Sequence, residues 1–133
     1  MNHTQNYQLN QWEPGDPVLH TDFNEDNRKI EAALKDRNIQ VFLDYYTGTG
    51  SGTIHHSYFR VPIMLIITGG GYTLLMARPA DKAVCWSGTG KCGVVNVTWD
   101  ESGLSWTTAN KDYELECNAK GVKYACIAFL TPQ

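Results

Sequence analysis

Four cysteines are the side chains of this sequence best suited to metal or redox chemistry. Six residues separate Cys85 from Cys92 and eight separate Cys117 from Cys126, whereas structural zinc sites use closer pairs, so the spacing argues against a metal. If Ser87–Gly90 is a four-residue hairpin loop, Cys85 lies opposite Cys92 and the pair can form a disulfide, while the other two thiols stay unpaired. The alternative is that all four thiols are free and buried, as expected for a chain made in a reducing compartment.

The remaining polar residues do not form a recognisable catalytic set. His55 and His56 are adjacent, so in a strand their rings point to opposite faces and cannot chelate one ion within a chain. The sequence holds no Gly-x-Ser-x-Gly elbow, no phosphate-binding loop and no carboxylate pair whose spacing would place it across a cleft. We therefore expect a protein that is not an enzyme and that binds no metal or cofactor.

Composition restricts the elements that must position these side chains. The 133 residues, 42% hydrophobic and rich in glycine and tyrosine, suit one modest domain of strands and tight turns. A net charge of −3 without clustered basic residues argues against nucleic-acid binding. The longest apolar run, 61–67, is too short to cross a bilayer, so no membrane insertion is expected. Residues 1–7 lack the features of a secretory signal, which predicts synthesis in a cytoplasm.

Residues 1–20 are predicted to form an extended arm. The Pro-Gly-Asp-Pro sequence at 14–17 forces a turn and excludes regular structure there. The large apolar side chains of the arm, which include Tyr7, Leu9 and Trp12, are too few to make a core. They must therefore pack on the main domain or on a partner.

A helix is predicted over residues 22–36. Thr21 or Asp22 is expected to cap its N-terminus, and acidic residues fill its first turn. One face has the 4, 3, 4 spacing of a short coiled-coil seam with an Asn that can fix the register. The alternative is a single amphipathic helix that lies on its own domain. The seam residues, with a predicted role in oligomerisation, are Phe23, Asn27, Ile30 and Leu34.

Short antiparallel strands are predicted from residue 39 onward. Their number and Gly-rich turns suggest a sandwich or a barrel, and we expect a β-sandwich at 39–133, preceded by the arm and helix of residues 1–38, which gives a mainly β fold. Both faces are apolar in 61–67 and 125–130, so the helix or a neighbouring subunit must cover the second face. The strands are expected at 41–46, 56–67, 72–77, 82–86, 91–99, 104–108, 112–117 and 122–130, the seventh of them with one wet, acidic face.

Aromatic side chains are the best candidates for contact with a ligand. Tyr72 and Trp86 could stack on the apolar faces of sugars while nearby polar groups bind hydroxyls. The same argument applies to Trp99 and Trp106, but their places at strand ends favour packing in the core or in an interface.

Both ends of the sequence carry motifs of a known family. The arm Tyr7-Gln-Leu-Asn-Gln-Trp12, the helix entry Asp22-Phe-Asn24 and the segment Ile30-Glu-Ala-Ala-Leu34 resemble the N-terminal segment of tail-fibre or receptor-binding proteins of phages and prophages. Those proteins come from Gram-positive, clostridia-like bacteria. Residues 46–50, 60–67 and 118–129 look like the C-terminal sandwich of the same family.

The resemblance implies a homotrimeric virion protein made in the bacterial cytoplasm. Tyr7, Leu9 and Trp12 would attach the arm to other tail or baseplate proteins, residues 22–36 would be a trimeric neck, and the sandwich would bind a cell-surface glycan. Tyr72 and Trp86 lie in the part least like the family, where receptor loops are expected. The alternative is a purely structural baseplate, collar or capsid decoration protein without a receptor.

Overall fold

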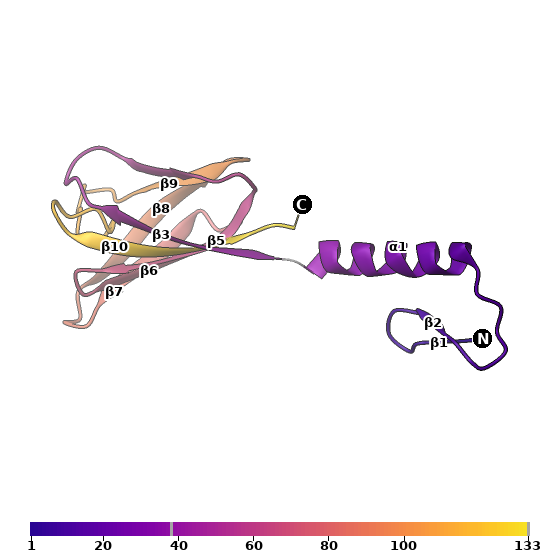
Figure 1. The fold of residues 1–133 in the computed structure, drawn as a ribbon. Coiled ribbons are helices and arrows are strands. Elements are labelled where there is room, and N and C mark those ends of the chain that lie inside the picture. Colours follow the sequence, from indigo (N-terminus) through magenta and orange to yellow (C-terminus); the bar gives the residue numbers. More distant parts are fainter. Residues whose placement is uncertain (38, 133) are drawn as a thin grey trace. The chain divides into compact units, whose positions relative to one another are not determined.

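The computed structural model describes residues 1–37 and 39–132, and these form a mainly β protein with one short helix. The described chain divides into two compact units: Ile39–Thr131, and an N-terminal unit made mainly of the residues before it. The ends of the predicted domains, at residues 38 and 133, lie outside the described residues. Figure 1 shows the elements of both units.

The N-terminal unit is a small hairpin followed by a helix. Strands β1 (Asn2–His3) and β2 (Asn10–Gln11) pair antiparallel, so the predicted extended arm instead turns back on itself. The Trp12 ring then stacks on Phe23 of the helix, with 5.4 Å between ring centroids. The arm therefore packs on the helix of its own unit.

Helix α1 (His20–Arg37) begins two residues earlier than predicted. Thr21 and Asp22 consequently lie within the first turn instead of capping it, and the Asp22 amide already donates to the Leu19 carbonyl. Two further contacts tie the arm to α1: the Asn10 amide donates to Asp26 Oδ1 at 2.9 Å, and Lys29 Nζ donates to the Gln8 carbonyl at 2.7 Å.

The second unit is one curled antiparallel sheet of eight strands within the described residues, where the sequence predicted a sandwich. The strand order places β3 and β4 at opposite ends, although these strands are consecutive in sequence. The sheet curls (Figure 1), so that side chains of β3 and β4 meet, as Tyr46 and His56 do, and the buried core residues lie on its inner face. In spatial order the strands are β3 (Gln40–Thr47), β10 (Lys123–Leu130), β5 (Pro62–Gly69), β6 (Tyr72–Ala77), β7 (Lys82–Ser87), β8 (Cys92–Trp99), β9 (Gly103–Thr107) and β4 (Ile54–Ser57).

Two glycines permit close approaches of the backbone near the two ends of the sheet. A Cβ at Gly48 would lie 2.1 Å from the Ala119 carbonyl oxygen, and a Cβ at Gly103 would lie 1.9 Å from the His56 carbonyl oxygen. Larger residues would therefore push the β3–β4 loop and strand β4 away from their neighbours.

Two predicted strands are wrong. The segment 56–67 is split between β4 and β5, which lie far apart in the sheet. The segment 112–117 forms successive turns, in which the Asn118 amide donates to the Tyr113 carbonyl and Cys117 has a positive φ of 51°. Glu116, expected on a wet face, is fully buried and accepts a hydrogen bond from Thr108 Oγ1 at 2.8 Å.

The predicted cysteine register is also wrong. Strand β7 pairs Cys85 with Gly93 and Trp86 with Cys92, because the loop between them is one residue longer than expected. Cys85 therefore points into the core while Cys92 is exposed, and the two cannot form a disulfide. The Cys85 thiol instead hydrogen-bonds the buried Cys117 thiol, which raises the pKa of Cys117, and burial raises the pKa of Cys126 to about 11.

The outer face of the sheet carries an apolar cross-strand row, as the two-faced apolar strands predicted. The register aligns one apolar residue from each of six successive strands, β3 to β8 in spatial order. Four members are large and exposed: Leu43 (55%), Leu75 (40%), Val84 (51%) and Val94 (55%). We call this the outer row, and its members are Leu43, Ile127, Ile66, Leu75, Val84 and Val94.

Candidate functional site

The end strands β3 and β4 line a concave surface of the second unit. Two adjoining hollows, of about 220 and 270 Å³, share Tyr46, His55 and His56 in their linings. Together they form what we call the edge cleft. It is defined by Phe42, Asp44, Tyr46 and Thr47 of β3, the β3–β4 loop residues Thr49, Ser51 and Thr53, the segment Ile54–Tyr58, and Asn118.

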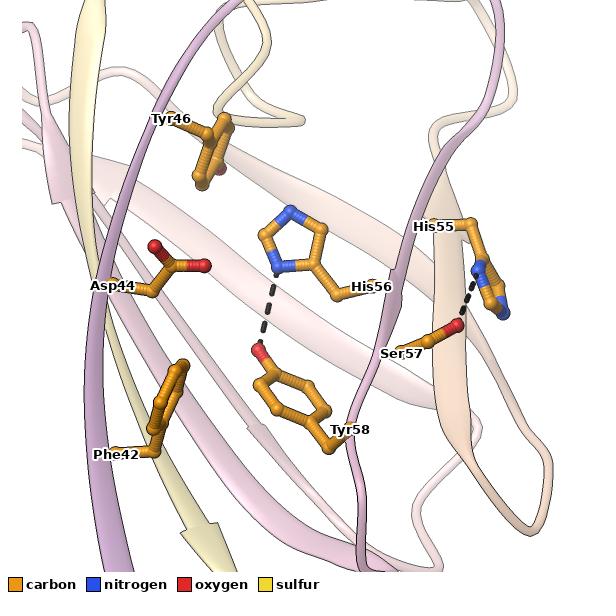
Figure 2. Close-up of a pocket in the computed structure, with 7 residues that line it drawn as sticks. All are labelled: Phe42, Asp44, Tyr46, His55, His56, Ser57 and Tyr58. Carbon is orange, nitrogen blue, oxygen red and sulfur yellow. Dashed lines mark hydrogen bonds between the residues drawn. The ribbon is translucent and has the colours of Figure 1, made fainter.

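Strand alternation selects the side chains of the cleft. Phe42, Asp44 and Tyr46 occupy every second position of β3 and so share one face. Figure 2 shows them projecting toward His56 and Tyr58 on the other side of the cleft, while the His55 side chain points away. The cleft thus places one carboxylate among four aromatic rings.

The rings of the cleft are held by contacts with each other and with the core. Phe42 meets Tyr58 edge to face at 6.2 Å between centroids, and Tyr46 meets His56 in the same way at 4.7 Å. Tyr46 also donates to the Cys117 carbonyl at 2.8 Å. The buried Trp106 lies against His56 at 5.0 Å. A ligand would therefore meet a preorganised aromatic wall.

The second hollow is lined by short polar side chains. Asn118 joins it to the loop, because its Oδ1 accepts from the Thr49 amide at 2.9 Å and its Nδ2 donates to the Ser51 carbonyl at 3.2 Å. Thr49, Ser51 and Thr53, which carry hydroxyl groups, line the same hollow. Rings beside several hydroxyl and amide groups are a combination that suits a carbohydrate.

The electrostatics of the cleft are dominated by Asp44. No lysine or arginine is among the described residues that line either hollow. Burial lowers the pKa of His56, and the nearby Asp44 carboxylate opposes that shift only in part. The ring is therefore neutral at neutral pH, and the carboxylate is the charged group of the cleft.

His56 gives the fold a dependence on pH. Because its folded-state pKa lies below the usual value of 6.5, the unfolded chain binds this proton first as the pH falls. Above about pH 6.5 we expect His56 to leave the free energy of unfolding independent of pH. Below that pH, protonation of His56 in the unfolded chain should lower the free energy of unfolding, by at most about 1.4 kcal/mol per pH unit. Urea titrations at several pH values should show a shallower decrease for His56→Gln than for the wild type or for a His3→Gln control. Equal slopes in all three would contradict the burial argument.

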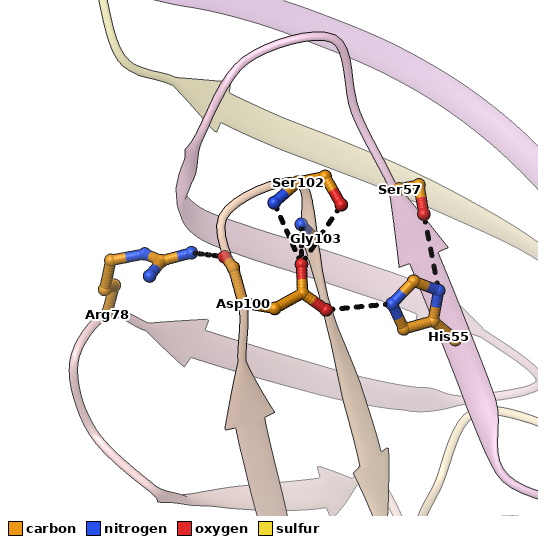
Figure 3. A network of polar contacts seen from close by, with 6 residues as sticks. All are labelled: His55, Ser57, Arg78, Asp100, Ser102 and Gly103. Carbon is orange, nitrogen blue, oxygen red and sulfur yellow. Dashed lines mark hydrogen bonds and ion pairs between the residues drawn. The ribbon is translucent and has the colours of Figure 1, made fainter.

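A second polar network joins the side chains of Ser57, His55 and Asp100 (Figure 3), on the side of β4 that faces away from Asp44. His55 Nε2 lies 3.2 Å from Asp100 Oδ2, and Ser57 Oγ lies 3.4 Å from His55 Nδ1, longer than a working nucleophile–base contact. Asp100 Oδ1 accepts backbone hydrogen bonds from Ser102 and Gly103, and the His55 contact and these donors lower the pKa of Asp100. We interpret the network as a clamp between β4 and the β8–β9 turn.

The two aromatic residues predicted to contact a ligand lie on opposite faces of the sheet. Tyr72 faces inward, is 9% exposed and donates to Glu114 at 2.6 Å. Trp86 lies on the outer face and is 44% exposed. Within one chain they cannot line one site. Trp106 packs in the core as expected. Trp99 is partly buried against the core, and the guanidinium carbon of Arg78 lies 4.8 Å from the centroid of the Trp99 ring.

The cleft residues were not selected from the sequence. Phe42, Asp44 and Tyr46 could have been found from the sequence. They occupy every second position of a predicted strand, so an aromatic, an acidic and an aromatic side chain follow each other on one face. Their proximity to His56 and Tyr58 depends on the curl of the whole sheet, which local patterns do not encode.

The chain matches no protein-family model and has no significant similarity to a curated protein or to a solved structure. The described part of the chain also contains no helix of the length and apolarity that a membrane span requires.

Proposed function

We propose that this chain is a homotrimeric phage tail fibre or receptor-binding protein that binds a glycan of the host cell surface. In this proposal α1 is a trimeric neck and the curled sheet serves as the sandwich-like binding domain. The observation that carries the binding role is the edge cleft, whose two adjoining hollows bring together aromatic rings, residues with hydroxyl groups and a carboxylate.

The N-terminal unit supports assembly because it has no core of its own. Among the described residues, the buried apolar core extends only from Leu65 to Leu130. On α1 the seam residues Phe23, Ile30 and Leu34 are 49%, 42% and 66% exposed. An exposed apolar seam at heptad spacing is stabilised when other helices cover it. Phe23 already stacks on Trp12, so Asn27, Ile30 and Leu34 would form most of the contact.

The outer row supports contact between the sheets of neighbouring copies. It extends over six strands, and exposed apolar patches of this kind are unusual on a monomer. In a closed trimer each copy would bury this surface, and no unpaired apolar surface would remain to add further copies.

The arm is proposed to attach the protein to tail or baseplate proteins of the virion. Tyr7 is 40% exposed, whereas Leu9 and Trp12 are half-buried against their own unit. Tyr7 is thus the most accessible of the three for a partner.

Light scattering and cell adsorption test the proposal together. We expect micromolar protein to have the mass of three chains and the fluorescently labelled trimer to bind cells of a clostridia-like panel. A Phe42→Ala variant, which removes a ring from the cleft rim, should keep the trimer mass and bind cells less. A monomeric wild type would contradict the assembly.

A purely structural virion component is the second candidate, and the outer row favours it because that surface can serve assembly alone. A trimer that binds to no cell in the panel would support this candidate and would contradict the receptor role.

A further inference from the structure

We infer that the edge cleft selects glycans that carry a free ammonium group, such as a hexosamine whose amine is not acetylated. This inference rests on the proposed function and specifies the ligand class of the same site. It follows from what surrounds Asp44.

The carboxylate of Asp44 is poised to accept a charged partner. Its Oδ1 accepts a hydrogen bond from the neighbouring Tyr45 amide at 2.8 Å, and no cationic side chain forms an ion pair with it among the described residues. In Figure 2 the carboxylate lies between Phe42 and Tyr46 and is directed toward His56. A ligand ammonium placed there would supply the missing cation and form a charge-assisted hydrogen bond.

The rings around Asp44 favour the same ligand. Ammonium groups are attracted to the faces of aromatic rings, and the attraction grows where water is excluded. Phe42, Tyr46 and Tyr58 supply such rings, and burial raises the pKa of both tyrosines far above neutrality, so they remain uncharged. The apolar face of a sugar ring can pack on the same surfaces.

Anionic ligands are disfavoured by the charge of the site and of the chain. No described lysine or arginine lines the cleft, His56 is neutral, and the chain carries a net charge of −3. A phosphate or a uronic acid would have to approach Asp44 without a compensating cation. Asp44 is exposed, and a neutral sugar would offer its carboxylate hydrogen bonds but no opposite charge.

Calorimetric titration with two matched oligosaccharides tests the inference. A β-1,4-linked glucosamine tetramer is expected to bind the wild-type trimer at least about tenfold more tightly than its N-acetylated counterpart. Asp44→Asn should remove most of this preference, since it keeps the side-chain shape and deletes the charge. Asp81→Asn deletes the same charge at an exposed site outside the cleft and should leave the preference intact. Added salt should weaken binding of the amine more than binding of the acetylated form.

Equal or tighter binding of the acetylated tetramer, or a preference that survives Asp44→Asn, would overturn the inference. Cell adsorption separates this failure from failure of the proposed function. Cells that bind wild type and Asp44→Asn equally would leave a receptor role in place and exclude the ammonium contact. An Asp44-dependent amine preference in a protein that adsorbs to no cell would support the ligand class and contradict the receptor role.

Discussion

Leu34→Asp should convert the proposed trimer into monomers at micromolar concentration. Leu34 is 66% exposed on α1, and in the proposed neck its three copies would be buried at the seam. Each copy would lose about 2 kcal/mol of apolar burial. Three carboxylates would also be brought together in an apolar contact, which adds a desolvation cost. Sedimentation velocity measures the outcome directly.

Ala32→Asp is the matched control for the seam. Residue 32 is exposed on the face of α1 opposite Leu34, and it receives the same side chain with a similar cost in helix propensity. This variant should remain trimeric. Dissociation by both variants, or by neither, would contradict the assignment of the seam, because the effect would not depend on the helix face.

Trp106→Ala should destabilise the second unit by about 3–5 kcal/mol, a large part of the stability of a typical small domain. Trp106 is 1% exposed, and its Nε1 donates to the Glu116 carbonyl at 2.7 Å. Its loss would leave a cavity and a buried carbonyl without its donor. Chemical denaturation followed by circular dichroism measures the change.

Trp99→Ala provides the comparison for the core. Trp99 is only half-buried, and its Nε1 donates to the Ala80 carbonyl at 2.8 Å near the surface. We expect a loss of roughly 1–2 kcal/mol for this variant. Equal losses at both tryptophans would contradict the placement of Trp106 in the core. Because Trp106 packs against His56, the folded fraction of Trp106→Ala should also bind ligand more weakly.

Strands β6 and β7 could be predicted from the sequence because the patterns that indicate them are local. Residues 72–77 and 82–86 alternate buried and exposed side chains between glycine and proline breaks, and they match β6 and β7 closely. The order of strands in the sheet depends on which distant segments pair. Strand β10 lies between β3 and β5, and β4 pairs with β9, so all eight strands join one curled sheet and the predicted sandwich of two sheets is not confirmed.

Other errors arise where tertiary packing overrides a local pattern. Residues 112–117 alternate like a strand, yet Glu116 is buried beside Trp106 and Thr108, and the backbone turns there. A loop longer by one residue moved Cys92 to the outer face, because a shift of one position reverses every side chain of a strand. The prediction assumed a loop of four residues between β7 and β8, and the sequence pattern did not determine that length.

The candidate site was missed for the same reason. Tyr72 and Trp86 were predicted to contact a ligand because aromatic rings stack on sugars and because both lie in the part least like the family, but neither lines the edge cleft. The wall of Phe42, Asp44 and Tyr46 becomes a site only when the curl of the sheet brings β4 opposite β3.

An NMR titration of the isotope-labelled protein with cell-surface oligosaccharide tests the central claim most directly. If the edge cleft binds a host glycan, the amide and side-chain signals of Phe42–Tyr46, His56–Tyr58 and Asn118 should shift in a saturable manner. Signals of the outer-row residues Ile66, Leu75, Val84 and Val94, which lie outside this set, should remain unchanged. Shifts confined to Tyr72 or Trp86, or no shifts with oligosaccharide from any strain to which the protein adsorbs, would contradict the account.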